Sequence, residues 1–360
     1  MPWVDDGRRP GQVDRLDTLP LALDPAHMSA VLAERARASV GPDFGIDALG
    51  IEIYRRHGNR CVVRYRATER VHNGTPPREW RVIGKVLPPG AGEDTDARMR
   101  ELWNHGFSRG AADGIAIPEP LAYVRELSML LQEDIGGVSV RNLLKRAPDA
   151  GPFRTAARAL AKLHGCGLPA GTPRGVDELM LRCHPRHPFL GLAFPDLAPL
   201  VDDIVDRARA LAERLAPLPV TPVHGDFHLG QVHVEGGRAW LVDFDALGFG
   251  DPASDLGNVL VFLSDKVRRE PALAPMVEAF REEYTARAGT DPWPRVPLYE
   301  ALTHLRRACK QIRLQEPGWS EKVHAMVERG RKAVARAESL CTFAGAGRAD
   351  GTGRNAGGAA

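Results

Sequence analysis

Acidic and amide side chains recur at short intervals within residues 223–256, which read VHGDFHLGQVHVEGGRAWLVDFDALGFGDPASDL. Asp226, Gln231, Asp243 and Asp255 are separated by five, twelve and twelve residues. The segment predicts a loop, a strand, a Gly-Gly turn and a second strand that ends at Asp243. Because loops at strand ends present polar side chains to ligands, we expect these oxygen-bearing groups to form the functional site.

The chemistry that suits such a set is phosphoryl transfer from ATP. The triphosphate carries Mg²⁺, which prefers carboxylate and amide oxygens as ligands. The acceptor hydroxyl needs a carboxylate that orients it and takes its proton, and a lysine must neutralise the phosphates. The chain offers one candidate for each role: Asp226 as the base, Gln231 and Asp243 as metal ligands, and Lys85 as the phosphate partner.

The motifs HGDFHLGQ, VDFD and GDPASDL together resemble the aminoglycoside phosphotransferase family, and the resemblance covers roughly residues 50–310. It implies an α+β, protein-kinase-like fold of two lobes, with ATP and Mg²⁺ as cofactors and a small-molecule hydroxyl as acceptor. By position, Asp226 matches the catalytic aspartate of the family and Asp243 its metal-binding aspartate. Asp255 matches a buried aspartate that braces the catalytic loop and does not touch substrate.

Two departures from the family pattern leave an alternative open. Gln231 stands where most members have Asn, although Gln also occurs there in maltokinase-like members. The segment His57–Arg60 carries one glycine where protein kinases use several, so that phosphate contact would fall to backbone N–H groups and Arg60. A nucleotide-binding pseudokinase with a regulatory or scaffold role is therefore the alternative to an active enzyme.

Lys85 lies in the strand-like sequence VIGKV, in a chain with seven lysines among 48 cationic residues. An edge-strand lysine that faces water is the plain interpretation. Its apolar neighbours favour a lysine that contacts phosphate. In related folds such a lysine pairs with a helix carboxylate, and Asp96, Glu93 and Glu101 are the candidates.

The expected hinge between the lobes falls after the apolar run Leu127–Leu131. We expect its backbone to hydrogen-bond adenine and its side chains to be weakly constrained. The hinge residues are Gln132, Glu133 and Asp134.

Three histidines lie close to the catalytic motif. His224 and His228 are expected to be structural, fixing the loop through hydrogen bonds. With His233 they invite a zinc-hydrolase interpretation, but their spacing within a loop and a strand fits no common zinc pattern. We therefore set that class aside.

The order of secondary-structure signals predicts a β-rich half followed by an α-rich half. The domain boundaries expected are 1–45 for an N-terminal helical extension, 46–135 for the nucleotide-binding N-lobe, 136–343 for the catalytic C-lobe, and 344–360 for a disordered tail. In the extension, Asp24 and Pro25 predict the first residues of a helix. Further helices are expected at 93–105, 154–164, 200–215, 255–264, 275–288 and 298–314, with a last helix ending near Phe343.

Composition excludes several other classes. The net charge of +2 argues against a nucleic-acid surface. No apolar run approaches the ~20 residues that span a bilayer, and the N-terminus lacks a secretory signal, so that a cytoplasmic protein without a membrane partner is expected. The five dispersed cysteines predict reduced thiols. Oligomeric state is not predicted.

The acceptor is open at the level of sequence. A polycationic aminoglycoside needs acidic patches, yet in the C-terminal half the acidic run is Glu282-Glu283. The arginine-rich segment 298–313 suits a neutral or anionic acceptor equally well. A sugar, an amino alcohol or a nucleoside-like compound is thus as compatible as an antibiotic.

Overall fold

The computed structural model describes residues 16–40, 44–57, 59–70, 79–144, 149–169, 171–215 and 217–349. The chain divides into two compact units. Unit 1 takes the chain up to Val138 together with His233–Asp245, and unit 2 takes Ser139–Val232 together with the chain from Ala246 onward. Across the described residues, no helix is long and apolar enough to cross a membrane.

Unit 1 is built on a five-stranded antiparallel sheet. Its strand order is β1–β2–β3–β6–β5. The predicted strand that contains Lys85 is confirmed as its third member. The strands are β1 (Ile46–His57), β2 (Arg60–Glu69), β3 (Glu79–Val86), β5 (Pro120–Val124) and β6 (Met129–Glu133).

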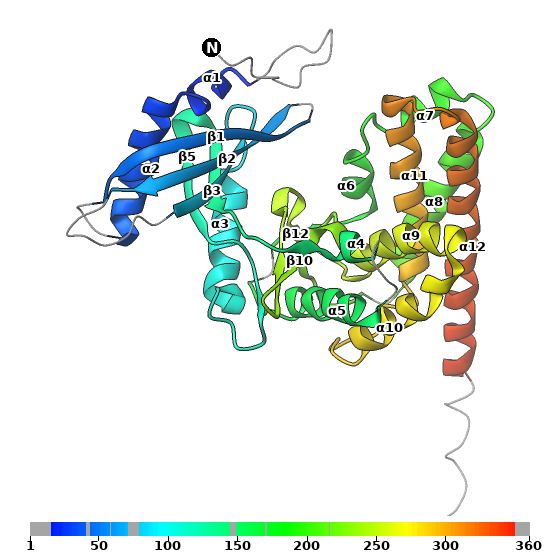
Figure 1. Cartoon of the computed structure of the whole chain (residues 1–360). Coiled ribbons are helices and arrows are strands. Elements are labelled where there is room, and N and C mark those ends of the chain that lie inside the picture. The colour runs from blue at the N-terminus through cyan, green and yellow to red at the C-terminus, as the bar shows by residue number, and fades with distance from the viewer. Residues whose placement is uncertain are drawn as a thin grey trace, which may run out of the picture. The chain divides into compact units, whose positions relative to one another are not determined.

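One face of this sheet is covered by the N-terminal helices α1 (Leu19–Ala22) and α2 (Pro25–Val40) (Figure 1). Every second residue of β2 packs into the core beneath them, and the Tyr65 hydroxyl donates to the Ala22 carbonyl at 2.7 Å. Because side chains alternate along a strand, Lys85 lies on the opposite face from Val86, which is in that core.

The beginning of α2 agrees with its prediction. Asp24 accepts a hydrogen bond from the backbone N–H of His27 at 2.6 Å, and Pro25 is the first helical residue. Within the predicted N-terminal extension the described residues contain the helices α1 and α2, whereas residues 1–15 and 41–43 lie outside the described residues.

The remaining elements of unit 1 follow the sheet. The predicted helix 93–105 is shorter than expected, because the backbone at His105 and Gly106 leaves helical geometry. A small sheet has the order β4–β11–β10–β7, and β4 pairs with β11 in parallel. These elements are α3 (Glu93–Leu102), η1 (Trp103–Phe107), β4 (Ile115–Ala116), η2 (Arg125–Leu127), β7 (Val138–Ser139), β10 (Val232–Glu235) and β11 (Arg238–Leu241).

Unit 2 is mostly helical, and all the helices predicted there are present. Its longer helices are α5 (Ala150–His164), α8 (Ala198–Arg214), α9 (Ala253–Arg269), α10 (Ala274–Thr285), α11 (Val296–Leu314) and α12 (Trp319–Ala349). Its short elements are α4 (Val140–Leu143), β8 (Pro173–Arg174), α6 (Val176–Leu181), α7 (Pro188–Ala193), β9 (Thr221–Val223), η3 (Leu229–Gln231), β12 (Gly248–Gly250) and η5 (Pro271–Leu273). The short helix η4 (Phe244–Ala246) crosses the boundary, with Phe244 and Asp245 in unit 1.

Several helix ends in unit 2 differ from the sequence-based expectation: α9 continues to Arg269, five residues past its predicted end, and α10 ends at Thr285, three residues before its predicted end. Helix α5 begins four residues before Arg154, because Asp149 caps it by accepting from the Gly151 N–H at 2.9 Å. Helix α12 continues past Phe343 to Ala349. The rest of the predicted tail, residues 350–360, lies outside the described residues.

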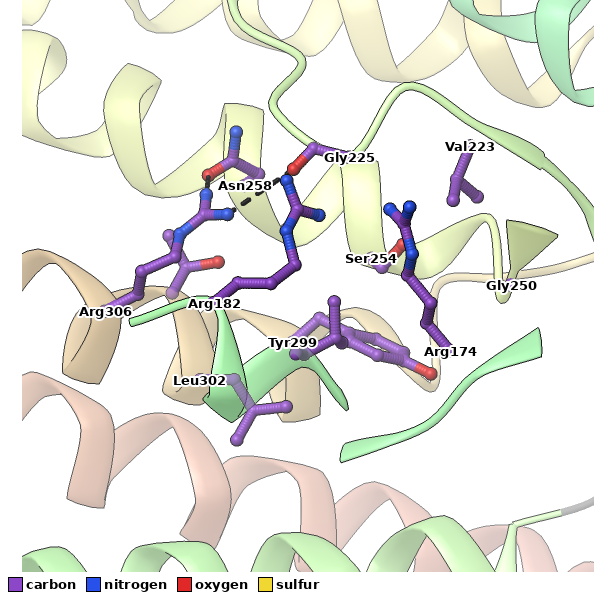
Figure 2. Close-up of a pocket in the computed structure, with 12 residues that line it drawn as sticks. Arg174, Arg182, Val223, Gly225, Gly250, Ser254, Asn258, Tyr299, Leu302 and Arg306 are labelled. Carbon is purple, nitrogen blue, oxygen red and sulfur yellow. Dashed lines mark hydrogen bonds between the residues drawn. The ribbon is translucent and has the colours of Figure 1, made fainter. Parts of the chain in front are cut away.

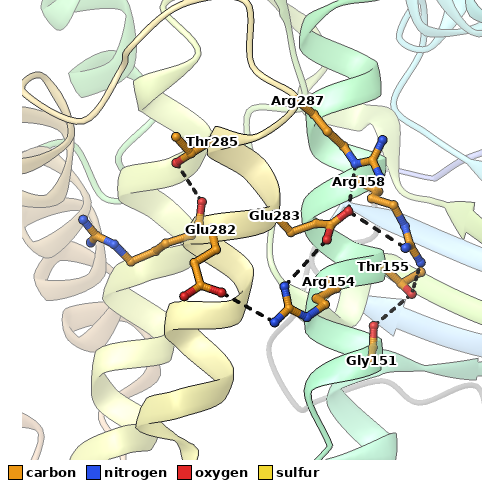
Figure 3. A network of polar contacts seen from close by, with 9 residues as sticks. Gly151, Arg154, Thr155, Arg158, Glu282, Glu283, Thr285 and Arg287 are labelled. Atoms are coloured by element: carbon orange, nitrogen blue, oxygen red, sulfur yellow. Dashed lines mark hydrogen bonds and ion pairs between the residues drawn. The ribbon is translucent and has the colours of Figure 1, made fainter.

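Ion pairs join α5 to α10 in unit 2 (Figure 3). Arg154 lies 3.5 Å from Glu282 and 3.8 Å from Glu283, and Arg158 lies 3.9 Å from Glu283. Arg287 donates to Glu283 at 2.8 Å. The acidic run noted in the sequence is therefore occupied by three arginines of its own unit.

Candidate active site

The HGD loop, residues 224–231, leaves strand β9 in unit 2 and carries Asp226. Asp255, in the first turn of α9, binds this loop from beneath. Its two carboxylate oxygens accept from the backbone N–H groups of His224 at 2.6 Å and Gly225 at 2.8 Å. The two residues immediately before Asp226 are thus fixed by one buried carboxylate.

Asp255 is itself held by α5. Nε2 of His164 lies 3.2 Å from its Oδ2, and Nδ1 of the same ring lies 2.7 Å from the Tyr284 hydroxyl. Burial alone would raise the pKa of Asp255, but the bonds to His164 and the loop outweigh it, so the net pKa shift is downward. His164, the last residue of α5, therefore orients this carboxylate.

Gly225 cannot be replaced without disturbing the loop. Its φ is +76°, a left-handed value that favours glycine. A Cβ there would collide with the Ala246 carbonyl oxygen and would lie 2.8 Å from Nη1 of Arg182. The glycine of the motif is therefore required by both backbone conformation and close packing.

The Asp226 side chain is 47% exposed, whereas the side chain of Phe227 beside it is fully buried. Nη2 of Arg306 lies 3.5 Å from Oδ1 of Asp226. Asn258 donates to the Phe227 carbonyl at 2.8 Å and accepts from Arg306. The backbone on both sides of Asp226 is anchored while its carboxylate faces outward.

His228 and Gln231 close the HGD loop. Nδ1 of His228 accepts from the Gly230 N–H at 3.0 Å, and its ring packs edge-on against Phe262 at 5.5 Å. Gln231 is buried and is the last residue of the short helix η3, one residue before β10.

In unit 1 the Lys85 ammonium is buried between two carboxylates. Its Nζ donates to Asp243 at 2.8 Å and to Asp245 at 2.6 Å. Burial alone would lower the pKa of Lys85, but the two carboxylates raise it above its ordinary value. The group therefore stays a cation.

The helix partner expected for Lys85 is corrected by this geometry. Asp96, the first candidate, accepts from Arg100 at 2.8 Å, and the rival Glu93 pairs with Arg125. Among the described residues, Lys85 bonds neither of these nor Glu101. Carboxylates about 160 positions away in the sequence take their place, a pairing that no local pattern could reveal.

Asp243 follows strand β11 with a φ of +67°, which is uncommon for a residue with a side chain. Its carboxylate is 34% exposed on one side of Lys85, and Asp245 on the other side also pairs with Arg60. Such backbone strain concentrates at functional sites. Arg60, which the sequence predicted to contact phosphate, therefore pairs with an aspartate of its own unit.

The oxygen donors present suit Mg²⁺. The described residues contain no group of three or more His, Cys, Asp or Glu side chains arranged to hold a metal. Mg²⁺ does not need one, because it is commonly held by one or two carboxylates together with substrate phosphates and water. Asp243, with a partly exposed carboxylate, meets that requirement.

The predicted hinge is the end of strand β6 and the residues after it. The N–H of Glu133 donates to the Glu119 carbonyl at 2.9 Å, and that of Asp134 donates to the Arg81 carbonyl at 3.2 Å. These two donors are already used within unit 1. The Asp134 side chain pairs with Arg64 at 2.8 Å, and the Glu133 side chain pairs with Arg109. Gln132 is half-buried.

A pocket beside the HGD loop was missed by sequence reasoning (Figure 2). Three of its lining side chains are arginines from different segments of unit 2: Arg174, Arg182 and Arg306. No motif links these positions, and only the arginine richness of the segment 298–313 hinted at one of them.

A β-rich unit with a lysine between aspartates, and a helical unit with a braced HGD loop, define an α+β phosphotransferase of the protein-kinase-like class. The chain matches the phosphotransferase enzyme family over residues 67–299 and belongs to that family. It is therefore a small-molecule kinase, as its motifs predicted.

Solved structures agree on the fold. A choline/ethanolamine kinase family protein from Mesorhizobium loti is 18% identical, with 87% of this chain and 99% of that chain covered and a TM-score of 0.55. The amicoumacin kinase hAmiN, in complex with AMP-PNP, Ca²⁺ and Ami, is 15% identical over 78% and 88%, with a TM-score of 0.57.

A thermostable mutant of the aminoglycoside phosphotransferase APH(4)-Ia, in a ternary complex with AMP-PNP and hygromycin B, is 17% identical. The match covers 86% of this chain and 97% of that chain, with a TM-score of 0.50. At such identities these likenesses establish the protein-kinase-like fold.

Proposed function

We propose that this enzyme transfers the γ-phosphate of ATP to a hydroxyl group of a small molecule such as an aminoglycoside, a sugar, an amino alcohol or a related metabolite. The observation that carries the proposal is the environment of Asp226. Its backbone neighbours are fixed by Asp255 and Asn258, yet its own carboxylate is half exposed. A catalytic base needs this combination of fixed position and open access.

Asp226 is assigned the role of base. Its carboxylate accepts a hydrogen bond from the acceptor hydroxyl and takes the proton as the hydroxyl oxygen bonds to the γ-phosphorus. The bond between that phosphorus and the bridging oxygen breaks, and its electron pair leaves on ADP. Positioning and charge stabilisation supply most of the rate enhancement in this type of reaction.

Lys85, Asp243 and Gln231 are assigned to ATP and its metal. The ammonium of Lys85 neutralises phosphate oxygens, and the proposed Mg²⁺ ligands are the carboxylate of Asp243 and the amide oxygen of Gln231. When bound, Mg²⁺ neutralises charge on the transferred phosphate. Backbone groups of Gln132, Glu133 and Asp134 other than the two engaged N–H donors are assigned to adenine. His224, His228 and Asp255 hold the HGD loop.

Replacing Asp226 by Asn tests the proposal. The amide cannot take the proton, so kcat should fall by about a hundredfold or more, while the Kd for MgATP changes less than about twofold. ADP release with a pooled panel of acceptors and MgATP binding by calorimetry are the measurements. The matched control is Asp206→Asn, on the exposed surface of α8, where the side chain is 71% exposed.

Retained turnover in Asp226→Asn would contradict the role of the aspartate. A wild-type protein that binds MgATP but phosphorylates no member of the panel would instead support the pseudokinase alternative.

A further inference from the structure

The arginine pocket, lined by Arg174, Arg182 and Arg306 beside the HGD loop, is strongly cationic. The other lining residues that the structure describes are neutral, and none of them is a carboxylate: Leu179, Val223, Gly225, Gly250, Ser254, Asn258, Tyr299, Leu302 and Thr303. Three guanidinium groups gathered in one hollow repel one another unless an anion lies between them.

Arg174 and Arg306 make their recorded hydrogen bonds chiefly to neutral oxygens. Arg174 donates to the carbonyls of Ala246 at 2.6 Å and Leu247 at 3.0 Å. Arg306 donates to the side chain of Asn258 and to the Gly225 carbonyl (Figure 2). Its one carboxylate contact, to Asp226, is long at 3.5 Å. These bonds hold the two guanidinium groups at the pocket.

Arg182 is the least satisfied of the three. Its Nη1 is buried, and among the described residues it has no hydrogen-bond partner. Burial, followed by the charges of Arg306 and Arg174, lowers the pKa of Arg182 to about 10. A buried cationic donor without a partner is costly, and a ligand oxygen would remove that penalty.

The acidic groups nearest to the pocket are already committed. Asp251 pairs with Arg295 and accepts from the Tyr299 hydroxyl at 3.0 Å. Asp255 accepts from the HGD loop and from His164. Burial and the charges of Arg306 and Arg174 outweigh the charges of Asp226 and Asp255, which act to raise the pKa of Arg182.

Helix α11 extends the cationic surface beyond the pocket. Arg306, Lys310 and Arg313 follow a spacing of four and three residues, which places them on one face of the helix. Burial lowers the pKa of Lys310, the charge of Asp226 acts to raise it, and those of Arg313 and Arg306 lower it further. This face of α11 therefore borders the proposed base.

We propose that the arginine pocket binds a carboxylate or phosphate group of the acceptor, so that the enzyme phosphorylates a hydroxyl compound that is itself an anion. The inference rests on the proposed function and restricts the range of possible acceptors to anions. A polycationic aminoglycoside would meet three arginines in a pocket whose described lining holds no carboxylate, whereas an anionic acceptor would pair with the buried Nη1 of Arg182 and bring its hydroxyl to the base.

The first experiment asks whether the pocket binds an anion at all. The thermal midpoint of the protein is measured with inorganic phosphate against sodium chloride of equal ionic strength, with saturating MgADP present to occupy the nucleotide phosphate positions. We expect phosphate to stabilise the wild type. Arg182→Gln should weaken this binding by about tenfold or more, and Arg331→Gln, an exposed arginine on α12, should leave it unchanged.

The second experiment compares acceptors that share a three-carbon skeleton and differ in charge. Glycerate and glycerol 3-phosphate are anions, glycerol is neutral and serinol is a cation; kanamycin represents polycations. ADP release gives kcat/KM for each. We expect an anionic member to exceed the neutral and cationic members by at least about tenfold, and Arg182→Gln to remove that preference while leaving the KM for MgATP unchanged. Comparing the two anions distinguishes a carboxylate from a phosphate.

The outcomes separate the inference from the proposed function. Preferred transfer to a neutral or cationic acceptor, unaffected by Arg182→Gln, overturns the inference and leaves the kinase proposal standing. Phosphate binding that depends on Arg182, without transfer to any acceptor, supports the anion site and counts against the kinase proposal. Equal phosphate binding by wild type and Arg182→Gln overturns the inference, whichever acceptor is used.

Discussion

Each of the two units has one ionic cluster at the residues that the motifs singled out. In unit 2, Asp255 accepts from two backbone N–H groups and contacts His164. In unit 1, Lys85 donates to Asp243 and Asp245. The sequence placed Asp255 through its motif. It did not reveal the partners of Lys85, because contacts between distant segments leave no trace in local spacing.

Replacing Lys85 by Met should weaken nucleotide binding. Two carboxylates would lose their shared cation and would repel the phosphates, so we expect the KM for MgATP to rise by about tenfold or more. Steady-state kinetics at varied MgATP measures the change. Lys332→Met, on the exposed face of α12, is the control, and a normal KM in Lys85→Met would refute the assignment.

Individual elements follow their local signals closely. The start of α2 was predicted because its cap involves neighbouring residues, whereas the start of α5 was placed too late because Asp149 was not recognised as its cap. Arg182 follows the short helix α6, whose six residues show no period long enough to predict its surroundings. The arginine pocket therefore could not be predicted from the sequence. The similarity to maltokinase-like members, which rested on Gln231, stays a prediction.

The HGD loop offers a test at the scale of an element. Gly225 and Gly237 have φ values of +76° and +79°, but only at Gly225 would a Cβ meet other atoms within 4 Å. Gly237→Ala should cost about 1–2 kcal/mol of unfolding free energy through backbone strain alone.

Gly225→Ala adds a collision to that strain, so it should destabilise the protein more and also lower kcat by displacing Asp226. Urea unfolding and kcat are measured for both variants. Equal losses in the two would show that packing against Ala246 and Arg182 is unimportant.

The stability of the whole molecule depends on pH through its buried titratable groups. His304 is buried among arginines, and burial, followed by Arg307 and Arg329, lowers its pKa from 6.5 to about 3. As pH falls below 6.5, the unfolded chain takes up a proton at this position and the folded protein does not. Stability should therefore decrease from pH 6.5 toward pH 3.

His304→Gln should remove this contribution. Thermal midpoints measured from pH 7 to pH 4 should fall less steeply in the variant than in the wild type. The other cations around His304 are Arg268 and Arg336, which remain charged throughout this range. Parallel curves for the two proteins would contradict the pKa shift.

The path of the chain also limits how this enzyme can be dissected. The backbone passes from unit 1 to unit 2 after Val138, returns at His233 and departs again after Asp245. A fragment ending at Val138 would lack Asp243 and Asp245, leaving the ammonium of Lys85 deprived of its counterions. No single truncation or protease nick can therefore release an intact unit 1.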